Sequence, residues 1–213
     1  MKTDELIAAL ARQADVVDPR LPFRRLLGAS LLGIAAALPL MLWSLGLNPS
    51  LASDAQVPMF WVKWAFVAAV ALATLMLVIR LARPGAAVQR AARAVVSPFF
   101  ALWALAAIAL LSAAPAERLP LVMGSSWNSC PLNIAMLSLP VLVLLLAVVR
   151  SLAPTRLRLA GTATGLLAGA LATLAYLLHC PELEAPFVAV WYVIGMAIPA
   201  VIGALIGPRV LRW

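Results

Sequence analysis

The feature that most constrains this chain is a series of six long apolar runs, none of which contains an Asp or Glu residue. They cover residues 26–47, 60–79, 95–114, 132–149, 159–178 and 187–207. A helix needs roughly 20 mostly apolar residues to cross the hydrocarbon core of a bilayer. Because lipid offers no hydrogen-bond partners to the backbone, we expect each run to be helical. The sequence therefore predicts an all-α polytopic membrane protein with a six-helix transmembrane bundle.

Composition excludes the two main alternatives. Hydrophobic residues make up 65% of the chain and charged residues 11%, against roughly 45–50% and 25% in soluble domains, so a soluble globule of this size would lack a solvated surface. The net charge of +8 would suit nucleic acid only if the basic residues formed a solvated face or stripe. They lie instead in short clusters between apolar runs, and we expect no direct contact with nucleic acid.

The basic residues also predict the orientation of the bundle. Cytoplasmic loops of membrane proteins carry an excess of Lys and Arg, and here 14 of the 16 basic residues fall on one side of the predicted spans, leaving Lys63 and Arg118 on the other. We therefore expect both termini in the cytoplasm and both cysteines on the opposite side, which is the periplasm if the membrane is a bacterial inner membrane. Lys63 lies inside the second run near its start, where its long stem is expected to reach the interface. The first run follows a polar stretch and is too long for the core of a signal peptide, so we expect it to remain in the membrane.

The predicted spans contain residues suited to helix packing and few residues suited to transport. Transport of ions or protons usually requires ionisable residues at mid-membrane depth, and the runs offer almost none, which weakens the alternative of a small transporter or exporter subunit. Gly161, Gly165 and Gly169 form a stripe of small residues that lets a second helix approach closely. The stripe fits helix packing inside the bundle or a dimer seam, so the oligomeric state stays open.

Cys130 and Cys180 are the most reactive residues of the chain. Each precedes a proline, which favours extended or turn geometry at the cysteine, and each lies at the same end of a predicted span, so the two can approach each other. Three interpretations compete: a structural disulfide, a reactive or metal-binding pair that senses a signal, and two unrelated buried thiols. A pair of thiols favours a transient soft metal ion, with His179 as a weak third candidate ligand. No cofactor is required, and the lack of a CxxC motif or a second cysteine pair argues against a thiol oxidoreductase.

Residues 3–15 predict a short amphipathic helix in the cytoplasm. Leu6, Ile7 and Leu10 share one apolar face, and Asp4 suits the positive first turn of a helix. So short a helix is marginal in water and needs a cover for its apolar face, either a groove on a partner protein or the membrane surface. We divide the chain into a cytoplasmic N-terminal segment, residues 1–25, and a six-span domain, residues 26–213.

Several short motifs, in this order and spacing, resemble the NrsF family of membrane-bound anti-sigma factors. They are Thr3-Asp4-Glu5-Leu6-Ile7 with Leu10, Ser126-Trp127 before Cys130-Pro131, Leu137-Ser138-Leu139-Pro140, Arg150 with Ala153-Pro154-Thr155-Arg156, Ala160-Gly161 with Gly165 and Gly169, Tyr176 with His179-Cys180-Pro181-Glu182, Phe187, Trp191-Tyr192 and Gly207-Pro208-Arg209. The stretch 14–23 departs from the pattern of the family, which leaves the lower end of the binding segment open.

The resemblance implies a function that is not enzymatic. Such a protein would sequester an extracytoplasmic-function sigma factor at the membrane and release it under heavy-metal or oxidative stress. The resemblance assigns the sensing role to Cys130 and Cys180, and it centres the sigma-binding segment on Asp4, Leu6, Ile7 and Leu10.

Overall fold

The computed structural model describes residues 3, 18, 20–83 and 85–212, and in these residues all regular structure is helical. Six helices are long and apolar enough to cross a membrane, which confirms the predicted spans. They are α2 (Leu21–Ser44), α4 (Pro58–Leu81), α5 (Gln89–Ser112), α7 (Cys130–Ser151), α8 (Leu157–Tyr176) and a last span formed by α9 (Ala185–Phe187), η1 (Val188–Tyr192) and α10 (Val193–Val210). Two short helices, α3 (Leu51–Asp54) and α6 (Pro115–Met123), lie in the connections and were not predicted.

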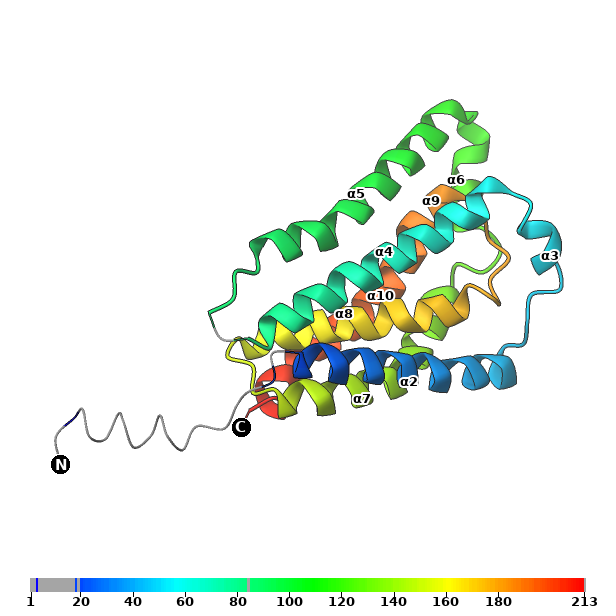
Figure 1. Ribbon diagram of the computed structural model, residues 1–213. Helices are drawn as coiled ribbons and strands as arrows, with labels where there is room; N and C mark the ends of the chain where they lie inside the picture. The colour runs from blue at the N-terminus through cyan, green and yellow to red at the C-terminus, as the bar shows by residue number, and fades with distance from the viewer. Residues whose placement is uncertain (1–2, 4–17, 19, 84, 213) are drawn as a thin grey trace.

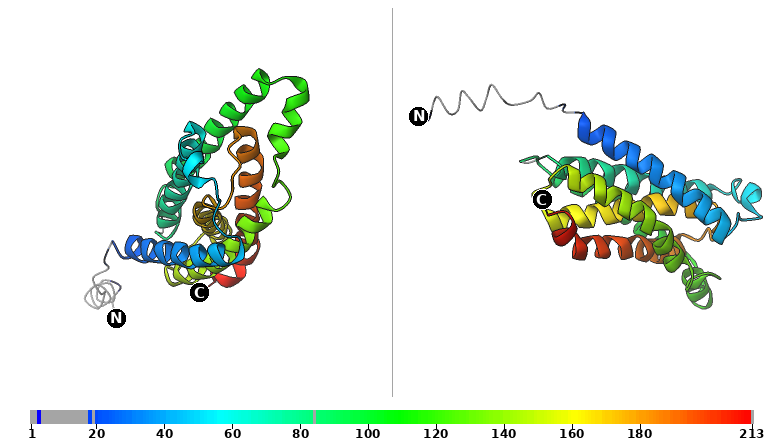
Figure 2. Two further views of the ribbon diagram at one scale, coloured as in Figure 1. Left: turned by 90° about the vertical axis from the view of Figure 1, so that its right-hand side faces the viewer. Right: turned by 90° about the horizontal axis from the view of Figure 1, so that it is seen from below.

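Helix α8 is the centre of the bundle. It packs against α10, α7, α4 and α2, and most of its residues are buried. Helix α5 lies apart from this group and packs on α4 and on the start of the last span, with α6 folded over at its far end (Figures 1 and 2). The cysteines and their neighbours are thus carried by the tightly packed part of the bundle.

The glycine stripe of α8 packs inside the chain against α10. A Cβ atom on Gly165 would lie 2.6 Å from the carbonyl carbon of Pro199 and 2.8 Å from the Cα of Ala200, closer than carbon atoms can approach. Gly161 faces the backbone of Gly203 in the same way. This face of α8 is therefore covered by α10 of the same chain, as in the packing interpretation of the stripe.

The last span contains a wide turn that the sequence did not reveal. Residues Val188–Tyr192 form a π-helix, η1, and such a turn changes which carbonyl groups have partners within the helix. Trp103 of α5 donates its indole N–H to the carbonyl of Ala189 at 3.1 Å. The depth of Trp103 in its span, away from the interfacial tryptophans, is explained by this bond.

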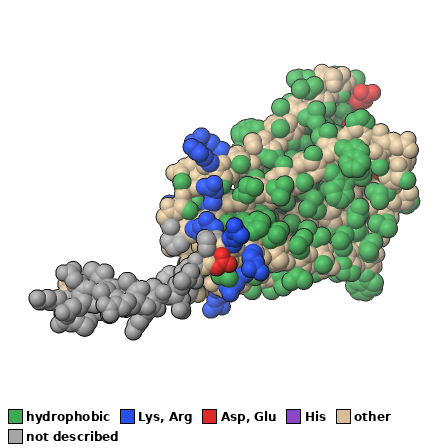
Figure 3. Space-filling model, in the orientation of Figure 1, with side chains coloured by type: hydrophobic (Ala, Val, Ile, Leu, Met, Phe, Trp, Pro, Cys, Tyr) green, Lys and Arg blue, Asp and Glu red, His purple; other side chains and the backbone are tan. Residues whose placement is uncertain are grey.

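The surface has the character expected of a protein in lipid. The basic side chains visible in Figure 3 gather at the end of the bundle at which Figure 1 marks both termini, and hydrophobic side chains are spread over the rest of the visible surface. Large apolar side chains stand fully outward, including Leu111, which is 78% exposed, and Trp43, which is 87% exposed. Exposed apolar surface on this scale would aggregate in water, so the chain is an integral membrane protein.

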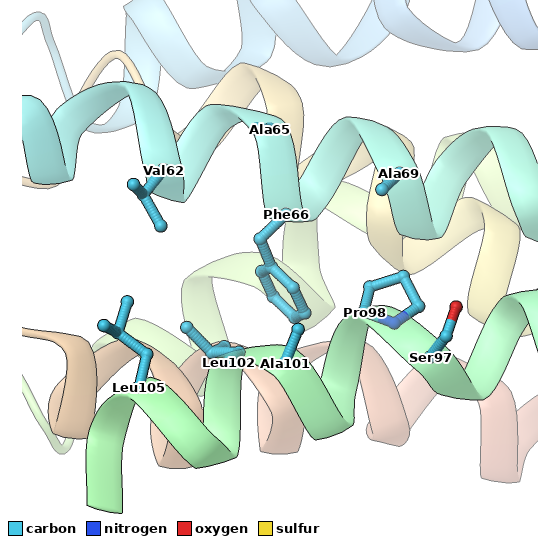
Figure 4. A pocket seen from close by; sticks show the side chains of 9 residues that line it. All are labelled: Val62, Ala65, Phe66, Ala69, Ser97, Pro98, Ala101, Leu102 and Leu105. Carbon is cyan, nitrogen blue, oxygen red and sulfur yellow. The ribbon is translucent and has the colours of Figure 1, made fainter. Parts of the chain in front are cut away.

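The crevice between α4 and α5 has an almost wholly apolar lining. It encloses about 600 Å³ and is lined by nine residues, all apolar except Ser97 (Figure 4). The hydroxyl of Ser97 donates to the carbonyl of Ala94 on its own helix. The described lining of this crevice thus contains no ionisable side chain.

Polar side chains buried in the spans are mostly satisfied locally. Ser30, Ser138, Thr164 and Thr173 each donate to a carbonyl of their own helix. Among the described residues, Lys63 is the one charged side chain that is buried. Apart from Lys63, the buried polar side chains of the described spans are therefore uncharged.

Candidate functional site

Cys130 and Cys180 come together at the end of the bundle opposite the arginines. Cys130 is the first residue of α7, and Cys180 lies in the loop between α8 and α9. Both are free thiols, with exposures of 0% and 2%, and their sulfur atoms are close enough to interact with each other. Pro131 stabilises the first turn of α7, because proline suits the start of a helix, and this fixes Cys130 at the helix boundary. The expected approach of the two thiols is therefore present in the structure.

Two tyrosines close the space around the thiols. Tyr176 comes from α8 and Tyr192 from η1, and their ring centres lie 6.0 Å apart. Their hydroxyl groups lie beside Cys130 and Cys180, respectively. The Tyr192 hydroxyl forms no well-aligned hydrogen bond with any described residue. Both rings are almost wholly buried, and they face the cysteines because their helices are rotated inward at this depth.

Lys63 also belongs to this site, and its expected position at the interface was wrong. Its side chain is 0% exposed, and its Nζ donates hydrogen bonds of 3.0 Å to the carbonyl oxygens of both Cys180 and Glu182. The same atom lies 6.0 Å from the ring centres of Phe60 and Tyr192. Lys63 points inward because the irregular loop offers carbonyl acceptors that no helix satisfies.

Glu182 joins the loop that carries Cys180 to the turn that leads into Cys130. Its Oε1 accepts hydrogen bonds from the backbone N–H and hydroxyl of Ser125, at 2.7 and 2.6 Å, and from the hydroxyl of Ser126 at 3.4 Å. Gly124 precedes them with a φ of +54°, and a Cβ atom there would lie 2.7 Å from Glu182 Oε2. The turn that leads into Cys130 therefore requires glycine at this position and a carboxylate opposite it.

His179 ties the same region to α2 and not to the thiols. Its Nδ1 lies 3.1 Å from the carbonyl oxygen of Gly46, just after the end of α2. The N–H of Asn48 donates to the carbonyl of Leu178 at 3.0 Å. In the described part of the chain, no group of three or more His, Cys, Asp or Glu residues is arranged to hold a metal ion. His179 is therefore not gathered with the two cysteines into a three-ligand site, because its ring is engaged with the backbone of Gly46.

The electrostatics of the site favour the ionised form of Cys180. The hydrogen bond from Cys130 is the largest influence that lowers the pKa of Cys180, followed by the Tyr192 hydroxyl, the backbone of Glu182 and the charge of Lys63. Together they outweigh burial, which acts in the opposite direction, and the pKa of Cys180 lies below its ordinary value. The thiolate is the nucleophile and the ligand for soft metals, so the lowered pKa favours Cys180 as the first of the two thiols to react.

Comparison with known proteins identifies the family. The family model described as "Negative regulator of sigma F", NrsF, matches residues 10–213. The chain belongs to the NrsF family. It is 48% identical over 213 residues to a protein of Azospira oryzae named probable anti-sigma-F factor NrsF, and 42% identical over 215 residues to the anti-sigma-F factor NrsF of Caulobacter vibrioides, with 100% of each chain covered in both cases. No solved structure matches the chain.

The predicted sigma-binding residues lie outside the part of the chain that the structure describes. These are Asp4, Leu6, Ile7 and Leu10, and the NrsF family model begins only at residue 10. The amphipathic helix predicted for this segment therefore stays a prediction, as does the boundary at residue 25.

Sequence reasoning missed the residues that organise the cysteines. Lys63 was assigned to the interface, and no role beside the cysteines was predicted for Tyr176, Tyr192 or Ser125. One signal was available for Lys63, because an ionisable residue inside a span is by default a candidate functional residue. For the tyrosines and Ser125 the sequence holds no comparable signal.

Proposed function

We propose that this NrsF protein is an inner-membrane anti-sigma factor that sequesters an extracytoplasmic-function sigma factor and releases it when Cys130 and Cys180 react. The observation that carries the proposal is the 48% and 42% identity, over the full chain, to two proteins named as anti-sigma-F factors. Proteins this similar over their whole length share a fold and, in most cases, the type of partner. The role is regulatory, with no catalytic step.

The basic end of the bundle supports the proposed orientation in the membrane. The arginines at the end of α4, the start of α5 and the connection between α7 and α8 lie with both termini at one end. The positive-inside tendency supports a cytoplasmic location for that end. The cysteine site then faces the periplasm, where thiols meet oxidants and metal ions before they reach the cell interior.

The proposed binding element is the N-terminal segment, residues 1–25. An apolar stripe of Leu6, Ile7 and Leu10 suits a groove on the sigma factor, in the helix-in-groove mode of recognition. The segment continues directly into α2 at Leu21, so a change in the position of α2 reaches the bound partner without an intervening domain.

The cysteine pair has two routes to a signal-dependent change. A peroxide oxidises the two thiols to a disulfide and is itself reduced to water, and a soft divalent metal ion binds the two thiolates with release of two protons. Either reaction replaces a contact between two thiols with a bond that links the start of α7 to the loop after α8. A signal that favours the released state 100-fold shifts the equilibrium by about 2.7 kcal/mol.

A co-purification experiment tests the binding part of the proposal. The double substitution Leu6→Asp and Leu10→Asp places charge on the apolar stripe, and the sigma factor is expected to be lost from the purified membrane protein. Ala8→Asp is the matched control, since residue 8 lies on the opposite face of a helix, and it should retain the partner. Retention of the sigma factor by the doubly substituted protein, inserted in the membrane at normal levels, contradicts the assignment.

A further inference from the structure

We propose that Lys63 is the positioning residue of the cysteine site: it clamps the loop carrying Cys180 onto α4 and so keeps Cys180 beside Cys130. The inference rests on the proposed function, in which these two thiols react with each other. It concerns a residue on a third helix that reacts with neither thiol.

The burial of Lys63 requires an explanation. Burying an ammonium group in a membrane bundle is costly unless hydrogen bonds satisfy it. Lys63 is 0% exposed, and two of its three donors are taken by the carbonyl oxygens of Cys180 and Glu182, both at 3.0 Å. Neither of these acceptors is a carboxylate: both are backbone carbonyl groups of the loop. The arrangement is that of a clamp on the backbone.

The loop depends on this clamp because it has little regular structure of its own. Residues 180–184 belong to no helix, and Pro181 between the two clamped carbonyls has no N–H to donate. An apolar side chain in place of Lys63 would leave both carbonyl groups unpaired in the interior, which proteins rarely tolerate. The loop would then move to satisfy them elsewhere.

The clamp reaches both cysteines. On one side, Lys63 holds the carbonyl of Cys180 itself. On the other side, Lys63 holds the carbonyl of Glu182. The carboxylate of Glu182 accepts three hydrogen bonds from Ser125 and Ser126, which lie in the turn just before Cys130. One side chain on α4 therefore holds the loop that carries Cys180 and, through Glu182, the turn that leads into Cys130.

Positioning matters for one step of the oxidation more than for the other. Hydrogen peroxide first reacts with Cys180: a sulfur–oxygen bond forms, the peroxide oxygen–oxygen bond breaks, and water leaves, which gives a sulfenic acid. The Cys130 sulfur then attacks the Cys180 sulfur: the disulfide bond forms, the sulfur–oxygen bond breaks, and a second water leaves with the Cys130 proton. The second step requires the two sulfur atoms to meet, so the loss of the clamp should slow it in particular.

The test uses the purified full-length protein with hydrogen peroxide. Disulfide formation and a dimedone-trapped sulfenic acid on Cys180 are both followed by mass spectrometry. Lys63→Met keeps the length of the side chain but removes its donors, and we expect the disulfide to form at least about tenfold more slowly while the sulfenic acid accumulates. Lys63→Gln retains an N–H donor and should restore part of the rate. Arg118→Gln, which removes the other basic residue at this end of the bundle, is the control and should react like the unsubstituted protein.

The outcomes separate this inference from the proposed function. If both Lys63 variants form the disulfide at the rate of the unsubstituted protein, the clamp is wrong. If Lys63→Met does not fold, Lys63→Gln decides, and an unchanged rate in that variant overturns the inference. Absence of any disulfide in the unsubstituted protein overturns it too. A disulfide that forms normally in the unsubstituted protein without release of the sigma factor contradicts the proposed function instead and leaves the clamp standing.

Discussion

The seam between α8 and α10 gives a prediction whose size follows from the structure. In Gly165→Ala the added Cβ would lie 2.6 Å from the carbonyl carbon of Pro199 and 2.8 Å from the Cα of Ala200, whereas carbon atoms prefer about 3.5–4.0 Å. The helices must separate by roughly 1 Å, which also opens the contact between Gly161 and Gly203. Overpacking of this kind costs about 1–3 kcal/mol, and the better helix propensity of alanine returns at most about 1 kcal/mol.

Gly28→Ala is the matched control. Gly28 lies in the interior of α2, with no atom within 4 Å of an added Cβ, so the same substitution should stabilise the protein by about 0.5–1 kcal/mol. Because both variants gain the helix propensity of alanine, they should differ by the overpacking cost alone, roughly 1–3 kcal/mol, or roughly 2–12 °C in Tm for a chain of this size. The assay is thermal unfolding in one detergent at one scan rate, followed by tryptophan fluorescence. Equal Tm values for the two variants would show that the helices are not in close contact at Gly165.

Two further predictions concern single hydrogen bonds. His179→Phe keeps the ring contact with Tyr176 but removes the hydrogen bond to Gly46, which links the Cys180 region to α2. We expect peroxide to form the disulfide normally while less sigma factor is released, measured by mass spectrometry and co-purification on the same sample. Full release would show that this hydrogen bond does not carry the signal to α2. Trp103→Phe removes the bond to the Ala189 carbonyl and should lower stability by about 1 kcal/mol, measured by the same thermal assay; an unchanged Tm would mean that the bond contributes nothing to the position of α5.

The six spans could be predicted because their signal is local. An apolar run of about 20 residues specifies a spanning helix whatever its neighbours are, and the basic clusters at the run ends specify which ends lie together. The proximity of Cys130 and Cys180 could be anticipated for the same reason, because both lie on the same side of the predicted bundle. The first turns of α2, α4 and α7 extend beyond the apolar runs because prolines there favour helix starts.

The inward side of each helix could not be predicted. In a bundle surrounded by lipid both faces of a helix are apolar, so periodicity does not reveal which face is buried. The inward orientations of Lys63, Tyr176 and Tyr192 therefore could not be predicted from the sequence. Nor could it be predicted that the glycine stripe of α8 packs against α10. The bonds from Lys63 to the Cys180 loop and from His179 to Gly46 join residues more than 100 positions apart, and they depend on how the helices pack.

The central claim is that one protein binds a sigma factor at one end and responds through its cysteines at the other. The most direct test follows the sigma factor that co-purifies with the tagged protein from cells before and after exposure to peroxide or cadmium, for the unsubstituted protein, Cys130→Ser and Cys180→Ser. We predict that all three bind the sigma factor in unstressed cells and that only the unsubstituted protein releases it under stress. Normal release by both serine variants would contradict the account.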